Sequence, residues 1–158
     1  MIVRTAGVDD RAAVDGFLEA NHTAHVARRG RLVDARAHPA LLAADEAGEL
    51  LGVATWILEG DEIEVLTLHA ARRWSGVGTA LLDAVAAIGR AHSCRRLWLV
   101  TTNDNLDALR FYQRRGMRLR ELRAGWVDDA RRTLKPGIAE RGLYDLPIRD
   151  ELELVLDL

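Results

Sequence analysis

A glycine-rich, basic segment stands out as a candidate ligand site. The run RRWSGVGTALL, Arg72 to Leu82, places two glycines, two arginines and a serine directly before an apolar stretch. The first backbone N–H groups of a helix lack intrahelical partners and carry the positive end of the helix dipole, so they favour anions such as phosphate. Gly76 and Gly78 have no Cβ atom, which lets a ligand approach the backbone closely. The segment therefore predicts an anion site to which Arg72 and Arg73 add charge.

Two familiar phosphate-binding motifs do not fit this segment. A Walker A motif ends in Gly-Lys-Ser/Thr, whereas Gly78 is followed by Thr79 and Ala80. The dinucleotide fingerprint requires a third glycine where this chain has Leu81. Because two glycines alone also fit a plain turn, the neighbouring residues have to decide between the two interpretations.

Two other pairs of residues are candidate site residues. Asn105 and Tyr112 are seven residues apart in a helix that the apolar pattern predicts over 106–115. Seven steps of about 100° return to nearly the same helix face, and Asn105 is also a suitable N-cap. Glu62 and Glu64 are two residues apart in a predicted strand, so their carboxylates share one face and are candidates for a general base.

The elements that must position these residues follow from hydrophobic patterning. Alternating and β-branched segments predict strands, apolar residues at helical spacing predict helices, and Gly48 and Gly60 predict turns. The expected strands are 2–5, 40–46, 50–57, 62–69, 97–102, 117–127 and 151–157, and the expected helices are 10–20, 79–92 and 106–115. The strands between Leu41 and His69 should form an antiparallel meander. The strand–helix–strand unit over 62–102 should cross over right-handed, which makes its strands parallel.

Four local features complete this prediction. Asp9 or Asp10 should cap the first helix, and Gly116 should end the third. Residues 21–38 hold either a further helix or a loop, because they lack a clear periodicity. We expect a bulge at Gly125 in the strand over 117–127, followed by a loop-rich stretch over 128–148.

Together these motifs resemble the GNAT superfamily of N-acetyltransferases. The run Arg73-Trp74-Ser75-Gly76-Val77-Gly78 matches Q/R-x-x-G-x-G/A, the acetyl-CoA pyrophosphate motif of that family. The run from Asn105 to Met117 is similar to the second family motif, N-x-x-A-x-x-x-Y-x-x-x-G-F, with methionine in place of the final aromatic residue. The resemblance covers the whole chain and is strongest over 62–117.

The resemblance implies an α/β (α+β) GNAT fold in a single domain over 1–158. This fold has a mixed, mostly antiparallel sheet of six to seven strands, a splayed parallel pair at its centre and about four flanking helices. In the family the pantetheine arm lies between the paired strands, here 62–69 and 97–102. The backbone near Leu66 and Leu68 would bind this arm, and an N–H near Leu66 would polarise the thioester carbonyl.

The resemblance also assigns roles to the remaining candidates. The pyrophosphate would be held by Arg73, Trp74, Ser75, Gly76, Val77, Gly78 and Thr79. Asn105 would contact the pantetheine, and Tyr112 would contact the sulfur and protonate the leaving thiolate. Glu64 is slightly favoured over Glu62 as the base, and a water chain stays open as a third choice.

The implied activity is transfer of an acetyl group from acetyl-CoA to a primary amine, without metal, by direct attack in a ternary complex. The amine could belong to a small molecule, an antibiotic, or a protein or peptide; the sequence selects neither among these nor between acetyl and longer acyl donors. Trp56, Trp126, Asn103 and residues 21–38 are candidates for the acceptor wall. The alternative is a non-catalytic acyl-CoA-binding sensor or interaction module.

Composition limits the partners and the compartment. A net charge of −2 argues against nucleic acid, and no apolar stretch reaches the roughly 20 residues that span a membrane. The single cysteine, Cys94, excludes an intrachain disulfide and suits the cytoplasm, as does the lack of a signal-peptide core. The histidines of 21–38 match no standard metal-ligand spacing. A homodimer formed through the closing strand and the 128–148 loop is compatible with the sequence.

Overall fold

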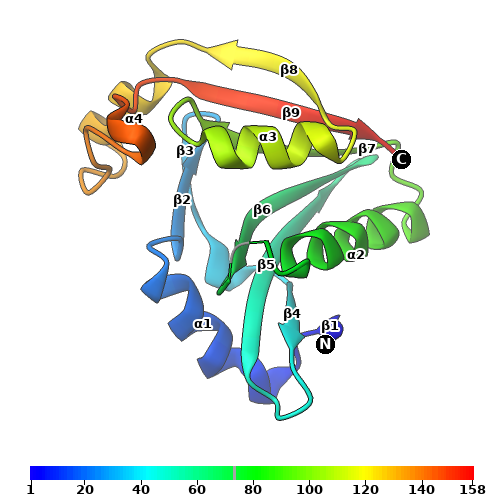
Figure 1. Ribbon diagram of the computed structural model, residues 1–158. Helices are drawn as coiled ribbons and strands as arrows, with labels where there is room; N and C mark the ends of the chain where they lie inside the picture. The colour runs from blue at the N-terminus through cyan, green and yellow to red at the C-terminus, as the bar shows by residue number, and fades with distance from the viewer. Residues whose placement is uncertain (73) are drawn as a thin grey trace. The chain divides into compact units, whose positions relative to one another are not determined.

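The structure, a computed structural model, describes residues 1–72 and 74–158. Seven strands follow the order β1-β4-β5-β6-β7-β9-β8 in a mixed sheet, and β2 and β3 form a separate ribbon. In this order β6 and β7 are the parallel neighbours, joined by α2, which confirms the predicted fold class. The elements in Figure 1 are β1 (Ile2–Thr5), α1 (Arg11–Ala20), β2 (His25–Arg28), β3 (Arg31–Asp34), β4 (Ala40–Ala44), β5 (Leu50–Glu59), β6 (Glu62–Ala70), α2 (Val77–Ala91), β7 (Arg96–Thr102), α3 (Leu106–Arg114), β8 (Arg118–Arg123), α4 (Trp126–Thr133) and β9 (Glu151–Asp157).

The chain divides into two compact units. The first comprises Met1–Val26, Asp34–Leu97 and Leu158, and the second comprises Ala27–Val33 and Trp98–Asp157. In the first unit β1, β4, β5 and β6 pair antiparallel, as the meander predicted. Gly48 (φ 84°) and Gly60 (φ 60°) lie in the two hairpin turns with the left-handed backbone that favours glycine.

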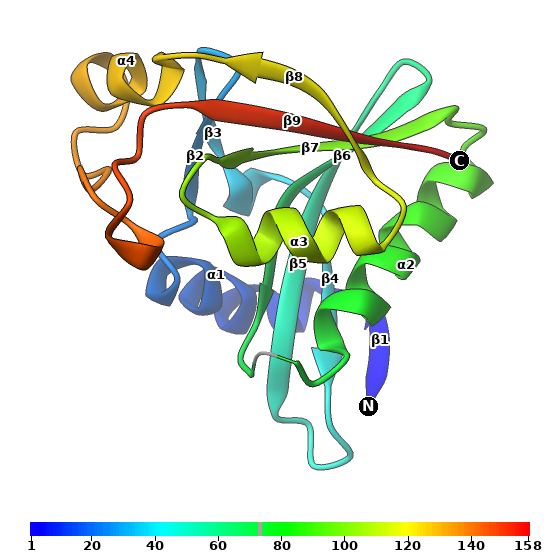
Figure 2. The same cartoon turned by 45° about the horizontal axis from the view of Figure 1, so that its top comes forward.

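Helix α2 packs closely on one face of these strands. Its buried residues include Leu81, Leu82 and Val85. A Cβ atom at Gly52 on β5 would lie 2.6 Å from Val77 Cγ1, and one at Gly89 on α2 would lie 2.7 Å from Ile63 Cγ2. Helix α1 flanks the strands from the other side and buries Val14 and Leu18 (Figures 1 and 2). The start and the end of α2 are therefore both fixed against the sheet.

In the second unit, β8 pairs antiparallel with β9 (Figure 2). The pairing passes from Leu119 to Glu121 with an additional residue, so the bulge lies at Arg120 and the prediction of a bulge at Gly125 was wrong. Gly125 (φ 74°) is instead the N-cap of α4, which occupies the start of the stretch predicted to be loop-rich. Gly116 (φ 84°) ends α3 as predicted.

Residues 21–38 form neither of the expected structures, a helix or a loop. They contain the β2–β3 ribbon, whose two connecting residues, Arg29 (φ 48°) and Gly30 (φ 73°), both have left-handed backbones. Two such residues in succession give the type I′ turn that suits the twist of a hairpin. The sequence signal is weak because one of these two positions is occupied by arginine, whereas asparagine, aspartate or glycine is the usual residue.

Candidate active site

A bulge interrupts β6 in the middle of the predicted thioester-binding stretch. Val65 pairs with Trp56, and Thr67 pairs with the adjacent Thr55, so Leu66 is an additional residue outside the β5 register. The buried Thr67 hydroxyl forms side-chain contacts with Thr55 next to the bulge. It accepts a hydrogen bond from the Thr55 backbone N–H at 3.2 Å and lies 2.8 Å from the Thr55 hydroxyl. A bulge re-aims the backbone, and here it does so at the residue expected to meet the thioester carbonyl.

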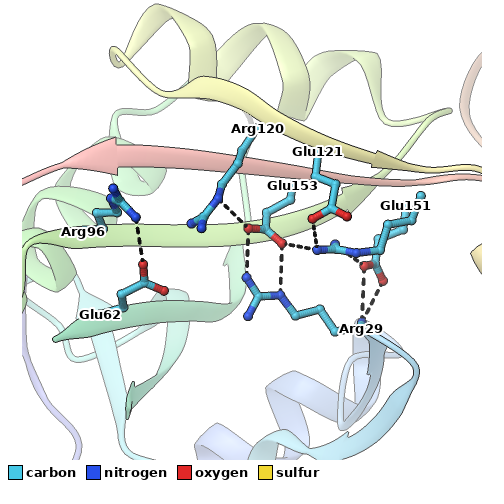
Figure 3. A network of polar contacts seen from close by, with 8 residues as sticks. Arg29, Glu62, Arg96, Arg120, Glu121, Glu151 and Glu153 are labelled. Carbon is cyan, nitrogen blue, oxygen red and sulfur yellow. Dashed lines mark hydrogen bonds and ion pairs between the residues drawn. The ribbon is translucent and has the colours of Figure 1, made fainter. Parts of the chain in front are cut away.

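The two glutamates of β6 lie on the sheet face opposite α2. Ile63 between them faces α2, as its closeness to Gly89 shows, and alternate side chains of a strand point to opposite faces. Glu64 is only 2% exposed. Glu62 is partly exposed and forms an ion pair with Arg96 at 3.5 Å (Figure 3). Their shared face was predicted, whereas their different surroundings required the structure.

Helix α2 opens with a glycine after the turn that follows β6. Its N-cap, Gly76, has φ 82° and no side chain caps the helix. The Ser75 hydroxyl donates to the Arg72 carbonyl at 2.7 Å, which stabilises the turn. Helix α2 begins at Val77, two residues before the predicted start, so Gly78 and Thr79 lie in its first turn. Arg73 lies outside the described residues, so its predicted role stays a prediction.

Two further β6 side chains near this turn were missed by sequence reasoning. Thr67 and His69 lie beyond the bulge and, by strand alternation, share a face with each other. Burial lowers the pKa of His69, so the neutral imidazole is favoured at neutral pH. Leu68 lies between them and is partly exposed. The only available signal was one break in the alternation of polar and apolar residues, where Val65 and Leu66 follow each other.

The second unit holds the predicted amide and phenol. Asn105 is the N-cap of α3, as predicted, and its side chain accepts a hydrogen bond from the Ala108 N–H at 3.2 Å. Tyr112 is buried and packs edge-to-face with Phe111, with ring centroids 5.2 Å apart. Burial raises the pKa of Tyr112 above its ordinary value. The phenol therefore carries its proton at neutral pH.

Asn103, a candidate for the acceptor wall, instead anchors the segment before β9. Its Oδ1 accepts hydrogen bonds from the backbone N–H groups of Arg149 (2.9 Å) and Asp150 (3.0 Å), and its Nδ2 donates to the Pro147 carbonyl at 2.8 Å. The neighbouring Asp104 accepts from the Leu143 N–H at 3.0 Å. The start of α3 is thus fixed by side chains that hold the 143–150 backbone.

The β2–β3 turn carries a polar network that sequence reasoning also missed. The Arg29 guanidinium donates two hydrogen bonds to Glu153, at 2.8 and 3.0 Å (Figure 3). It also lies 3.5 Å from the centroid of the Trp98 ring. The Arg29 N–H donates to Glu151 at 3.0 Å. Of the other acceptor-wall candidates, Trp126 is 41% exposed with Arg123 over its ring, and Trp56 is partly buried on β5.

Residues 11–117 match the family model described as the acetyltransferase (GNAT) family. The chain belongs to the GNAT acetyltransferase family. Two curated relatives from Bacillus subtilis (strain 168), both described as uncharacterized, match it across most of their length. YdhI is 39% identical over 110 residues, covering 70% of this chain and 68% of YdhI. YxbD is 40% identical over 114 residues, covering 72% of this chain and 71% of YxbD.

Solved structures show the same GNAT fold. An IAA acetyltransferase from Bacillus cereus superposes with a TM-score of 0.75 at 17% identity, covering 99% of each chain. A GNAT acetyltransferase from Elizabethkingia anophelis with acetyl-CoA bound superposes with a TM-score of 0.69 at 18% identity, covering 99% of this GNAT chain and 97% of the other. A Bacillus subtilis acetyltransferase in complex with CoA gives 0.70 at 14% identity, with the same coverage of 99% and 97%.

Among residues 1–72 and 74–158, no three or more His, Cys, Asp and Glu side chains are grouped so as to hold a metal ion. In the same described part of the chain, every helix is too short or too polar to cross a membrane.

Proposed function

We propose that this GNAT protein transfers the acetyl group of acetyl-CoA to a primary amine by direct attack in a ternary complex. The observation that carries the proposal, beside the family itself, is the path of β6. The strand passes from two glutamates, through the bulge at Leu66, into a glycine turn that opens α2 without a side-chain cap. The bulge suits a carbonyl oxygen and the helix start suits a phosphate group.

The donor would lie along this path. In the roles that the family resemblance implies, the backbone at Leu66 and Leu68 binds the pantetheine arm and Asn105 contacts it. The pyrophosphate is held by the segment Arg73–Thr79, where the N–H groups that open α2 supply most of the donors. The Leu66 N–H polarises the thioester carbonyl and stabilises the oxyanion that forms on attack.

The chemistry needs one base and one acid. Glu64 takes a proton from the ammonium form of the acceptor, and the free amine then attacks the thioester carbon. The new C–N bond forms, the C–S bond breaks, and Tyr112 donates its phenolic proton to the leaving thiolate, while the second proton lost by the attacking nitrogen restores the phenol. Glu64 is preferred to Glu62 because it is buried two residues before the bulge, whereas Glu62 is engaged by Arg96.

The experiment that tests the activity is an amine panel. Small amines, amino acids, aminoglycoside-type antibiotics and peptides are incubated with the protein and acetyl-CoA, and release of the free thiol is followed. Turnover with at least one acceptor class supports the proposal. Tight binding of acetyl-CoA without thiol release across the whole panel would favour the sensor instead.

A matched pair of glutamine variants tests the base. Glu64→Gln should lower kcat and remove the ionisation that governs the acidic limb of the pH–rate profile, because glutamine cannot accept the proton. Glu62→Gln is the control and should leave that limb in place. An unchanged profile in Glu64→Gln together with a changed one in Glu62→Gln would transfer the role to Glu62.

The two tyrosines of the chain provide a matched test of the acid. Tyr112→Phe should lower kcat by about 10²–10⁴ with little change in the KM for acetyl-CoA, the usual contribution of a general acid. Tyr144→Phe removes an exposed phenol that donates to Asp107 at 2.6 Å and should leave kcat unchanged. Equal kcat values for wild type and Tyr112→Phe, with the chemical step limiting turnover, would remove Tyr112 from the mechanism.

A further inference from the structure

A pair of buried hydroxyl groups joins β5 and β6 at the bulge. Thr55 is fully buried and Thr67 is 4% exposed. The Thr67 hydroxyl accepts a hydrogen bond from the Thr55 N–H, and the two hydroxyl oxygens lie 2.8 Å apart. A buried polar group needs a hydrogen-bond partner, because burial without one costs free energy. The two threonine side chains therefore satisfy each other.

This contact depends on where the bulge lies. On β5, Gly52 faces α2, so by strand alternation Thr55 lies on the opposite face. On β6, Ile63 faces α2, and an uninterrupted alternation would turn Thr67 toward α2 as well. The additional residue at Leu66 moves Thr67 to the other face, where it pairs with Thr55. A bulge placed after Thr67 would separate the two hydroxyls and leave both without this partner.

The neighbouring side chains of β6 do not select this position for the bulge. The run from Val65 to Leu68 is apolar except for Thr67. A one-residue slip moves each side chain to the other face of the strand, and an apolar side chain gains by burial on either face. Thr67 is the residue of this run whose hydrogen-bond partner is available in one register only.

We propose that Thr67 is the positioning residue of the donor site, because its hydroxyl sets the bulge at Leu66 and thereby selects the backbone N–H that meets the thioester carbonyl. The inference rests on the proposed function, in which the Leu66 N–H polarises that carbonyl. A hydrogen-bond donor stabilises an oxyanion only from a defined distance and direction. A bulge that moves by one residue presents a different part of the backbone to the same acetyl group.

A set of matched variants tests this role. Thr67→Val removes the hydroxyl and keeps the shape of the side chain, whereas Thr67→Ser keeps the hydroxyl and should behave as the wild type. Thr55→Val is the control, because it removes the other hydroxyl but keeps the backbone N–H that donates to Thr67. Both valine variants lose the same hydroxyl contact, so a merely structural role predicts equal effects. Thr67→Ala, which places no methyl group against that N–H, replaces Thr67→Val if the latter does not fold.

The register is measured first, in the protein without ligand. Cross-strand nuclear Overhauser contacts between positions 55 and 67 should have the same strength in the wild type, Thr67→Ser and Thr55→Val. They should be weakened or lost in Thr67→Val, because the bulge is then no longer held in one place. Contacts of wild-type strength in Thr67→Val would overturn the inference, whatever reaction the protein catalyses.

The thioester carbonyl is measured next, by infrared difference spectroscopy of bound acetyl-CoA labelled with carbon-13 at the carbonyl. A hydrogen bond lowers the stretching frequency of a carbonyl group. The bound band should lie below that of free acetyl-CoA in the wild type and in Thr55→Val, and should return toward the free value in Thr67→Val. With the chemical step limiting turnover, kcat of Thr67→Val should fall by about 10², the cost of a misplaced or missing oxyanion donor, with a much smaller change in the KM for acetyl-CoA.

The outcomes separate this inference from the proposed function. If the carbonyl band is lowered equally in the wild type and in Thr67→Val, only the role of Thr67 fails. Equal losses in Thr55→Val and Thr67→Val would also overturn that role and leave the function in place. If the wild type does not bind acetyl-CoA, or binds it with the carbonyl band of the free molecule, the thioester site itself is refuted, and the positioning role with it.

Discussion

Replacing Glu153 with glutamine should strongly destabilise the second unit. The Glu153 side chain on β9 is 1% exposed. It receives two hydrogen bonds from Arg29 and one from Arg123 at 2.7 Å. Glutamine keeps the shape of the side chain and removes its charge. The side chain at position 153 would then no longer neutralise the positive charges of the two guanidinium groups. Its amide N–H₂ would also face hydrogen-bond donors instead of acceptors.

The structure sets the expected magnitude. Removing one partner of a buried ion pair costs about 3–5 kcal/mol, because the other charge stays buried. Arg123 is 9% exposed and retains Glu151, which lies 2.8 Å away, whereas Arg29 is about one-third exposed. Because Arg123 keeps a carboxylate partner and Arg29 is partly in contact with water, we expect the free energy of unfolding to fall by about 3 kcal/mol, the lower end of that range.

Urea unfolding monitored by circular dichroism measures this loss. With an m value of about 1–3 kcal/mol per molar urea, the midpoint should fall by about 1–3 M while m stays the same. Glu121→Gln is the matched control. It removes the same type of charge from the same Arg123, at 2.6 Å, but at a side chain 53% exposed, so it should cost less than about 1 kcal/mol. Similar losses in both variants would refute the reasoning from burial.

The pH dependence supplies an independent check. Burial raises the pKa of Glu153, but hydrogen bonds and charges from Arg29 and Arg123 outweigh it and hold the pKa below its ordinary value. The unfolded state therefore binds the proton at a higher pH than the folded state. The stability difference between wild type and Glu153→Gln should be constant above about pH 5.5 and shrink as the pH falls below about 4.5. A difference independent of pH would contradict the ionic origin of the effect.

Three further substitutions probe how the candidate site is held. Gly78→Asp should abolish CoA binding in a titration, yet raise thermal stability slightly, by about 0.3–1 kcal/mol, because an acid in the first turn suits the helix dipole; retained binding would refute the pyrophosphate site. Gly52→Ala places a Cβ atom 2.6 Å from the His69 carbonyl oxygen and from Val77 Cγ1. It should destabilise the chain by about 1–3 kcal/mol in urea and weaken CoA binding by displacing the start of α2, and a neutral result would argue against that tight packing. Asn105→Ala removes the cap of α3 and should cost about 1 kcal/mol, with Asn105→Ser restoring most of it if capping is the cause.

Sequence patterns located the elements well where local signals were strong. The turn at Gly48, the cap at Asn105 and the helix end at Gly116 each depend on a residue type that the local backbone requires. Asp10 is the N-cap position of α1 as predicted, but it makes no capping bond to the helix. Its carboxylate instead accepts hydrogen bonds from Arg4 and from the Gly7 N–H. The position of Asp10 at the start of α1 was thus predictable from the local sequence, whereas its ion-pair partner, Arg4, comes from β1.

The errors arose where distant segments decide the structure. The β2–β3 ribbon has little apolar alternation, and its turn begins with an arginine whose side chain lies against Trp98 and Glu153, more than 60 residues away in sequence. The bulge at Leu66 shows in the sequence only as one break in an alternation, where Val65 and Leu66 are consecutive apolar residues, and the pairing with β5 is needed to identify it as a bulge. Local propensity carries no information about such register shifts.

The sequence by itself determined the family, and it predicted the anion-binding turn and the role of the Tyr112 phenol, because these depend on residue types at fixed local spacings. Only the tertiary structure decided which of the two β6 glutamates is buried, where the backbone of that strand is re-aimed, and that Trp74 lies exposed beside the turn. The alternation over 151–157 predicted a strand but not the surroundings of its glutamates. The structure buries Glu151 and Glu153, because arginines from other elements compensate their charge. Burial and register depend on contacts between distant residues, and a linear pattern does not contain them.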